Sequence, residues 1–491
     1  MQKRKITRRA RAVGVLLAGL AAASACAGPP DSPSSVTAAA VTAQAVAWQP
    51  CFDGLECGSV TVPADWRRPD DAERITIGLG RLPAQDRARR IGTLLVNPGG
   101  PNPVLFGLPR LAVQLAELRQ WFDVVVFDPR GMGESSGVTC STDPPGPLVA
   151  APPDRAAFAQ YVAAQQRFAR DCALALGALA GTLDAWQVAH DMDAVRAAMG
   201  EERLDYFGNS YGTVYGQAYA ELFPGNVRRM YLDSVADHTT ADLYEMVAPK
   251  AEALEANLHG FAGWCGREPS CALHGQDALA VWDRVVAAAE RAPIPAPGAG
   301  TSVDAPGLLG SVAARVRRER AWPELATALA AADRGDATAF APTPPPSTPD
   351  VPGGALMGLA TCADLLESID HDRVERLAEQ LRAVAPRLGW TEPWNFQARC
   401  AGLPTGTFPP RPISAPGLPP VLVVNGDDDS ATPPEFGRRL VDQLPGARYL
   451  DADGGHAVYL TGNPCVREHA HHYLVTGELP PPEVTCAASG S

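Results

Sequence analysis

Residues 204–212 read LDYFGNSYG, and the segments on either side of Ser210 determine how the whole chain is interpreted. Residues 204–207 have the pattern of a short buried strand, and residues 214–222 have that of a helix. The G-x-S-x-G motif at residues 208–212 lies between them. A strand that turns sharply into a helix holds the serine in an exposed, strained position, and the helix N-terminus offers N–H groups to a developing oxyanion. We therefore interpret Ser210 as a nucleophile rather than as part of a structural turn.

A serine hydroxyl needs a base, and the base needs an acid that orients it. In hydrolases with this kind of elbow, the order along the chain is serine, acid, histidine. Three aspartates, residues 427–429, follow the strand-like residues 421–425, and His456 follows two glycines after the next strand-like segment. Both positions are at the carboxyl ends of strands, where the active site of a parallel α/β sheet lies. His456 is the predicted base, and spacing leaves the choice among the three aspartates open.

Two glycines, Gly99 and Gly100, follow an earlier strand-like segment. In this position a backbone N–H can complete an oxyanion hole together with the N–H of Tyr211. Asp128 and Arg130 follow the next strand-like segment. We predict that these two residues form a structural pair beside the site and take no part in catalysis.

From about residue 48 the sequence alternates short apolar runs with amphipathic segments, which is typical of a parallel sheet covered by helices on both faces. The alternation stops after Asp233 and resumes at Pro420, with helical segments and proline-rich stretches between. This pattern predicts an α/β-hydrolase fold with a mostly parallel sheet and a large, mainly helical lid inserted before the last strands. The predicted parts are a signal peptide (1–25), a flexible tether (26–47), the N-terminal part of the core (48–237), the lid (238–415) and the C-terminal part of the core with the acid and the histidine (416–491).

The first 25 residues have the features of a signal peptide, because six basic residues precede an apolar run too short to span a bilayer permanently. The pair Arg8-Arg9 leaves both the Sec and the twin-arginine export routes open. The segment Ala23-Ser24-Ala25-Cys26 is similar to a lipoprotein box with lipid on Cys26, and it fits ordinary signal-peptidase cleavage equally well. We expect an exported protein, either extracellular or held at the outer face of the cell membrane as a lipoprotein.

Eleven cysteines are present, and ten remain if Cys26 is lipidated or removed. In an oxidising compartment these ten are expected to form disulfides, because no C-x-x-C and no zinc-ligand spacing is present. His469, His471 and His472 lie on a predicted C-terminal helix and are interpreted as a solvated face rather than a metal site. No metal or cofactor is predicted. In chain order the cysteines form five local pairs, Cys51–Cys57, Cys140–Cys172, Cys265–Cys271, Cys362–Cys400 and Cys465–Cys486.

The net charge of −13 becomes more negative once the basic signal peptide is removed. Such a surface repels nucleic acid and anionic lipid, so neither is an expected partner, and a lipid on Cys26 is the only expected link to a membrane. The oligomeric state stays open. Lys250 is the single lysine outside the signal peptide, and we interpret this scarcity as a bias of composition without functional meaning.

Five motifs together resemble those of secreted tripeptidyl aminopeptidases, which are relatives of prolyl iminopeptidase, and the resemblance covers nearly all of the chain after the signal peptide. These motifs are residues 97–101, 127–133, 208–213, 426–433 and 454–459. The family pattern G-x-x-D-x-x-T-P, laid on the fourth motif, selects Asp429 among the three aspartates. The resemblance implies exopeptidase activity on peptides with a free N-terminus. One departure lies beside the oxyanion hole, where NPVLFG at residues 102–107 replaces the family's glycine and Ser-Gly pair.

The leading hypothesis is an exopeptidase that forms an acyl-enzyme on Ser210 and acts on peptides. Such an enzyme must hold a cationic N-terminus, and Asp364 and Glu367 are candidates for this contact, with exposed helix carboxylates as the alternative. The alternative enzyme is a carboxylesterase or amidase that acts on a small molecule, because the same triad also cleaves esters. A non-catalytic binding protein with this fold is disfavoured, because all three triad residues are present.

Overall fold

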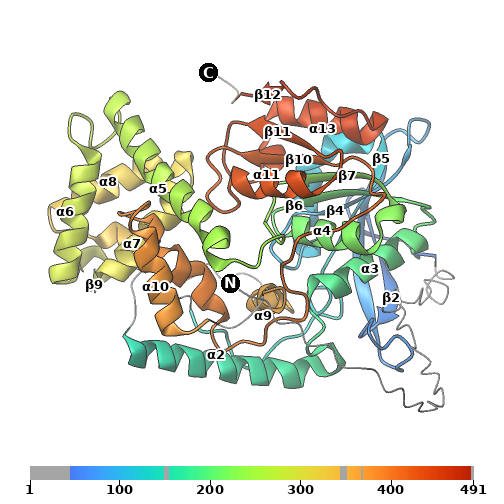
Figure 1. The fold of residues 1–491 in the computed structure, drawn as a ribbon, viewed down its shortest axis with the longest axis horizontal. Coiled ribbons are helices and arrows are strands. Elements are labelled where there is room, and N and C mark those ends of the chain that lie inside the picture. Colours follow the sequence, from blue (N-terminus) through green and yellow to red (C-terminus); the bar gives the residue numbers. More distant parts are fainter. Residues whose placement is uncertain (1–44, 147, 149–153, 343–350, 366–368, 488–491) are drawn as a thin grey trace, which may run out of the picture. The chain divides into compact units, whose positions relative to one another are not determined.

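The computed structural model describes residues 45–146, 148, 154–342, 351–365 and 369–487 (Figure 1). The predicted signal peptide, Cys26, nearly all of the tether and Glu367 lie outside these residues. Among the helices of the described ranges, none combines the length and the apolar character needed to cross a bilayer.

The centre of the fold is a ten-stranded sheet with the strand order β1-β2-β3-β5-β4-β6-β7-β10-β11-β12. The strands from β5 to β12 pair in parallel, which confirms the predicted mostly parallel sheet, and β1, β2 and β3 add an antiparallel edge that was not predicted. The bounds are β1 (Gln49–Phe52), β2 (Leu55–Pro63), β3 (Arg74–Leu82), β4 (Gly92–Asn97), β5 (Phe122–Phe127), β6 (Leu204–Asn209), β7 (Val227–Asp233), β10 (Leu422–Gly426), β11 (Arg448–Ala452) and β12 (Thr485–Cys486).

Helices cover both faces of this sheet. Successive residues of a strand point to opposite sides, so neighbouring residues of one strand pack on different sets of helices. In β4, Leu95 belongs to the apolar cluster that contains residues of α2, α3, α4 and α11. Its neighbours Leu94 and Val96 belong to a second cluster with residues of α1, α12 and α13. The helix bounds are α1 (Leu108–Gln114), α2 (Arg155–Leu176), α3 (Ala185–Ala198), α4 (Gly212–Leu222), α11 (Pro434–Gln443), α12 (Val458–Thr461) and α13 (Pro464–Thr476).

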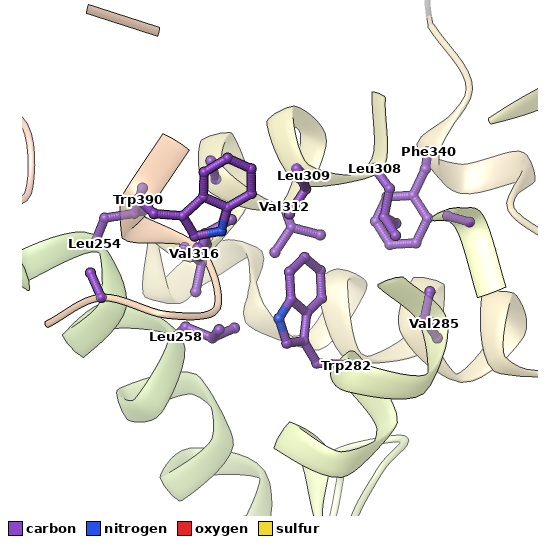
Figure 2. Packing of buried hydrophobic residues seen from close by; sticks show 14 of the residues in the cluster. Leu254, Leu258, Trp282, Val285, Leu308, Leu309, Val312, Val316, Phe340 and Trp390 are labelled. Carbon is purple, nitrogen blue, oxygen red and sulfur yellow. The ribbon is translucent and has the colours of Figure 1, made fainter. Parts of the chain in front are cut away.

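The segment between β7 and β10 is mainly helical, as predicted, and has an apolar core of its own. Trp282 and Trp390 lie in this core among leucine and valine side chains (Figure 2). Four of its helices begin at an aspartate whose side chain accepts a hydrogen bond from an N–H of the first turn. The elements are α5 (Leu243–Arg267), α6 (Ala278–Arg291), the hairpin β8 (Ile294–Ala296) and β9 (Thr301–Val303), α7 (Ala305–Val316), α8 (Trp322–Asp333), α9 (Met357–Ala363) and α10 (His371–Leu381).

Part of the predicted lid packs on the sheet and not on the lid core. Leu356, Cys400, Leu403 and Phe408 belong to the same apolar cluster as helices α3 and α4. The boundaries 238–415 therefore stay a prediction. The structure contains five disulfides, and they join the ten described cysteines in the pairs proposed from the sequence.

Candidate active site

Ser210 lies at the sharp turn between β6 and α4, with a positive φ of 54° that residues other than glycine rarely adopt. The two motif glycines permit this turn. A Cβ on Gly208 would lie 2.6 Å from the carbonyl oxygen of Gly212, and a Cβ on Gly212 would lie 2.4 Å from that of Asn97. The sequence motif therefore forms a strained turn of the kind predicted from the sequence for a nucleophile elbow.

His456 and Asp429 form a hydrogen-bonded pair at the ends of β11 and β10. His456 Nδ1 lies 2.8 Å from Asp429 Oδ2. The other oxygen of Asp429 accepts hydrogen bonds from the backbone N–H groups of Ala431 and Thr432, both at 2.9 Å. The Thr432 hydroxyl donates to Asp429 Oδ2 at 2.6 Å and lies 3.1 Å from His456 Nδ1. Thr432 was not singled out from the sequence, although it is the threonine of the family pattern.

The pair shifts the pKa of each member toward the charged form. Burial alone would raise the pKa of Asp429, but the charge of His456 and the hydrogen bonds hold it below its usual value. Burial alone would lower the pKa of His456, but the Asp429 charge and hydrogen bond raise it above the usual value. Asp429 is thus an ionised carboxylate that fixes a proton on Nδ1 and leaves Nε2 as the proton acceptor.

The structure distinguishes among the three neighbouring aspartates. Asp429 is 1% exposed and contacts His456, whereas the side chains of Asp427 and Asp428 are exposed. Burial and nearby carboxylates raise the pKa of Asp427 and Asp428. Only Asp429 of these three has the environment of an orienting acid.

The dipeptide Asp233-Ser234, at the end of β7, connects the serine elbow to the histidine loop. The carbonyl oxygen of Asp233 accepts the N–H of Ser210 at 3.0 Å, and Ser234 Oγ accepts the N–H of Ala457 at 2.7 Å. In the sheet, β6, β7, β10 and β11 are consecutive neighbours. Ser210, Asp429 and His456 therefore lie at the carboxyl-terminal ends of neighbouring strands, although no hydrogen bond joins Ser210 to His456 in the described structure. Catalytic hydrogen bonds are often long without substrate.

Of the three backbone N–H groups predicted for the oxyanion hole, that of Gly99 is already hydrogen-bonded within the protein. The N–H of Gly99 donates to Asn97 Oδ1 at 3.0 Å, so the prediction for Gly99 is wrong with respect to its N–H. Gly99 instead packs on the elbow, because its φ is 100° and a Cβ there would lie 2.7 Å from Ser210 Cβ. Among the described residues, no hydrogen bond engages the N–H groups of Gly100 and Tyr211. These two groups are the remaining donors for an oxyanion.

Asp128 and Arg130 are both structural, but they do not pair with each other. Asp128 accepts hydrogen bonds from the backbone N–H groups of Val104 and Leu105, and thereby holds the loop in which the chain departs from the family. Arg130 is buried and binds Asp191 of α3 through two hydrogen bonds, at 2.6 and 2.8 Å. The predicted pairing is therefore corrected.

A pocket of about 210 Å³ adjoins Ser210 and is lined by residues of the core and of the lid, Asp364 and Lys250 among them. Asp364 is 2% exposed, which excludes the alternative of an exposed helix carboxylate. Its oxygens accept hydrogen bonds from the Tyr211 hydroxyl and the Ala185 N–H, and burial raises its pKa well above the usual value. Asp364 thus lines the pocket with both oxygens already accepting hydrogen bonds, and its contact with a cationic amine, like that of Glu367, stays a prediction.

Lys250 has a place in this pocket that composition did not reveal. It is buried on α5, and its ammonium group donates to the carbonyl oxygen of Ala431 in the acid loop at 2.6 Å. Asn257, also on α5, donates to the carbonyl oxygen of Asp428 at 3.1 Å. The scarcity of lysine stays interpreted as a bias of composition, but this one lysine contacts the loop that carries Asp429.

The C-terminal histidines do not converge on one point. His471 Nε2 lies 2.7 Å from the Tyr459 hydroxyl, and His472 Nε2 lies 3.1 Å from a carboxylate oxygen of Glu478. The group around His469 includes Cys465 and Cys486, whose sulfurs form a disulfide and are not free to bind an ion. These contacts are structural.

Comparison with known proteins gives two family matches and several similar chains. A family described as "TAP-like protein" matches residues 386–486, and one described as "alpha/beta hydrolase fold" matches residues 92–282. A tripeptidyl aminopeptidase of Streptomyces lividans is 29% identical over 92% of this chain and 89% of its own length. The serine protease Hip1 of Mycobacterium tuberculosis is 32% identical over 90% and 91%, and a carboxylesterase B of the same species is 30% identical over 99% of each chain. The predicted α/β-hydrolase fold is confirmed.

Proposed function

Because the chain belongs to the serine hydrolase family of the tripeptidyl aminopeptidases and the serine protease Hip1, we propose that it is an exported exopeptidase. It cleaves peptide bonds near a free N-terminus through an acyl-enzyme on Ser210. The observation that carries this proposal is the hydrogen bond between His456 and the buried Asp429, beside a serine elbow that opens into a pocket.

The reaction follows from the geometry of these groups. Ser210 Oγ attacks the carbonyl carbon while His456 Nε2 takes the hydroxyl proton, and the N–H groups of Gly100 and Tyr211 bind the oxyanion. His456 then gives the proton to the departing amine, which leaves an ester on Ser210. Water, deprotonated by His456, attacks this ester and releases the acid product. Asp429 stays ionised throughout and stabilises the imidazolium that forms in each step.

Export is supported by the five disulfides, which persist in oxidising compartments. Cys26, the residue that would carry the lipid, and the cleavage site before it lie outside the described residues. Detergent partitioning of the mature protein tests for a lipid on Cys26. Recovery of all protein in the aqueous phase would contradict lipidation.

Labelling with a fluorophosphonate probe tests the nucleophile. The wild type is expected to react, and Ser210→Ala is expected to lose both labelling and turnover while keeping its circular dichroism spectrum, because the change removes only one hydroxyl. Labelling that persists in Ser210→Ala would place the nucleophile elsewhere.

The exopeptidase activity is tested with a tripeptidyl amide and its N-acetyl twin at one pH and salt concentration. A charge-assisted contact between the free amine and a carboxylate, for which Asp364 and Glu367 stay the predicted candidates, is worth about 1.5–3 kcal/mol, so kcat/KM should favour the free form by about tenfold to a hundredfold. Equal values for the two substrates would exclude an aminopeptidase.

A second candidate is a carboxylesterase, and the similarity to carboxylesterase B over 99% of both chains favours it. An esterase has no reason to discriminate between free and blocked amines. Rapid hydrolysis of simple esters together with no hydrolysis of any tripeptidyl amide would establish this alternative.

A further inference from the structure

We propose that Lys250 and Arg399 form a subsite for a carboxylate of the substrate in the pocket beside Ser210. This inference deepens the proposed function and rests on it. Lys250 lies on α5 and Arg399 in the short helix Ala398–Cys400, and both line the pocket that Ser210 opens into.

Lys250 is held in place without being neutralised. Its Nζ donates to the Ala431 carbonyl oxygen and lies 4.2 Å from the centre of the Phe396 ring. An ammonium group has three N–H donors, and no carboxylate of the described residues lies within ion-pair distance of it. The nearby carboxylates are engaged elsewhere, Glu392 with Arg317 and Asp429 with His456.

The burial of Lys250 disfavours its charged form. Desolvation lowers the pKa of Lys250 to about 8, in spite of the two carboxylates nearby. Arg317 and, to a smaller extent, Arg399 contribute in the same direction, because their positive charges also lower the pKa of Lys250. An arriving anion would relieve both effects, since it replaces lost solvation and separates two like charges.

The acidic groups of the pocket do not balance these cations. Asp237 accepts hydrogen bonds from the N–H and the hydroxyl of Thr239, and its second oxygen binds Arg439. Asp364 is bonded through both oxygens, with a pKa raised by burial. His238 is neutral at physiological pH, because burial lowers its pKa to about 4. Among the described residues of the pocket, Asp237 is thus paired with an arginine and Asp364 is engaged through both oxygens, whereas Lys250 has no carboxylate partner.

A carboxylate is the group that this subsite fits. It accepts charge-assisted hydrogen bonds from an ammonium and a guanidinium group at the same time. The apolar lining, which includes Val214, Met246 and Phe436, lowers the local dielectric and strengthens such contacts. The carboxylate has two possible sources, an acidic side chain in the acyl part of the substrate or the C-terminal carboxylate of the leaving part.

Two pairs of substrates separate these sources. In the acyl arm, chromogenic peptide amides carry Glu or Gln at each position in turn, and in the leaving-group arm, short peptides end in a free carboxylate or a carboxamide. In one arm, kcat/KM should favour the charged member by at least about tenfold. Esters with the same acyl pairs give the comparison independently of amide cleavage. If the esters are cleaved with this preference and no peptide is cleaved, the exopeptidase proposal fails while the subsite stands.

Variants locate the preference. Lys250→Met and Arg399→Gln should each reduce the charged-to-neutral ratio to within about twofold of one, and Arg399→Glu should invert it. The ratio is internal to each variant, so a general loss of activity from a disturbed acid loop in Lys250→Met leaves it unchanged. Arg334→Gln removes one exposed positive charge outside the pocket and should keep the wild-type ratio. Equal or better hydrolysis of the neutral member in both arms by the wild type would overturn the proposal.

Discussion

Replacement of Asp429 by asparagine tests the orienting acid most directly, because the hydrogen bonds of the site dictate how the amide must sit. Oδ1 accepts two backbone N–H groups, from Ala431 and Thr432. The amide oxygen has to take this position, since an NH₂ group there would face two donors. The NH₂ group then takes the place of Oδ2 and points at His456 Nδ1, 2.8 Å away in the wild type.

An NH₂ group in that position donates to Nδ1 and forces the ring proton onto Nε2. A histidine in this tautomer cannot accept the proton of Ser210. A wrong tautomer in this kind of triad costs about 10⁴-fold in kcat, which corresponds to about 5.5 kcal/mol of transition-state stabilisation. The loss in Asp429→Asn should therefore be about 10⁴-fold, with little change in KM.

The assay is kcat and KM on an activated ester and on a peptide amide, with thermal unfolding as a control for folding. Asp428→Asn is the matched variant, because Asp428 is an exposed neighbour, and it should change kcat by less than about twofold. Asp429→Asn that keeps more than about a tenth of the wild-type kcat would refute the tautomer argument. A larger loss in Asp428→Asn than in Asp429→Asn would mean that the acid has been misidentified.

Three further predictions concern the pH profile, the oxyanion loop and the disulfides. The base must be neutral to accept a proton, so a raised pKa of His456 moves the acidic limb of the pH profile of kcat/KM to higher pH. The midpoint of this limb should lie above about 6.5, and a lower midpoint would contradict the ion pair of His456 with Asp429. Gly99→Ala should reduce kcat on the order of 10²-fold, because its Cβ would lie 2.7 Å from Ser210 Cβ. Gly107→Ala is the control, because a Cβ at Gly107 has open space and should leave kcat unchanged. Equal kinetics of the two variants would contradict the packing of Gly99 on the elbow. Double replacement of Cys362 and Cys400 by serine, which opens a 38-residue separation, should lower the free energy of unfolding by about 4 kcal/mol in urea titrations. Opening the six-residue separation of the disulfide-bonded Cys51 and Cys57 should cost about 2 kcal/mol, and the reverse order would contradict the loop-length argument.

Several features of this protein follow from the sequence alone, because they depend on local patterns. A buried strand, a G-x-S-x-G turn and a helix are readable within twenty residues, and so Ser210 could be placed at an elbow. The alternation of strands and helices predicted the parallel part of the sheet. The antiparallel edge β1–β3 was not predicted, because no helix connects these strands and the alternation of strands and helices was the pattern used to find the sheet.

The tertiary structure decided which groups meet. Three adjacent aspartates have the same local sequence signal, and the burial of Asp429 against His456 separates it from its neighbours. The partner of Arg130 is Asp191, 61 residues away, and Lys250 reaches the acid loop across 181 residues. Periodicity and turn chemistry act over a few residues, whereas hydrogen-bond partners and desolvation are set by packing between distant segments. For this physical reason the serine elbow could be found in the sequence, and the partners of the charged groups in its pocket could be found only in the fold.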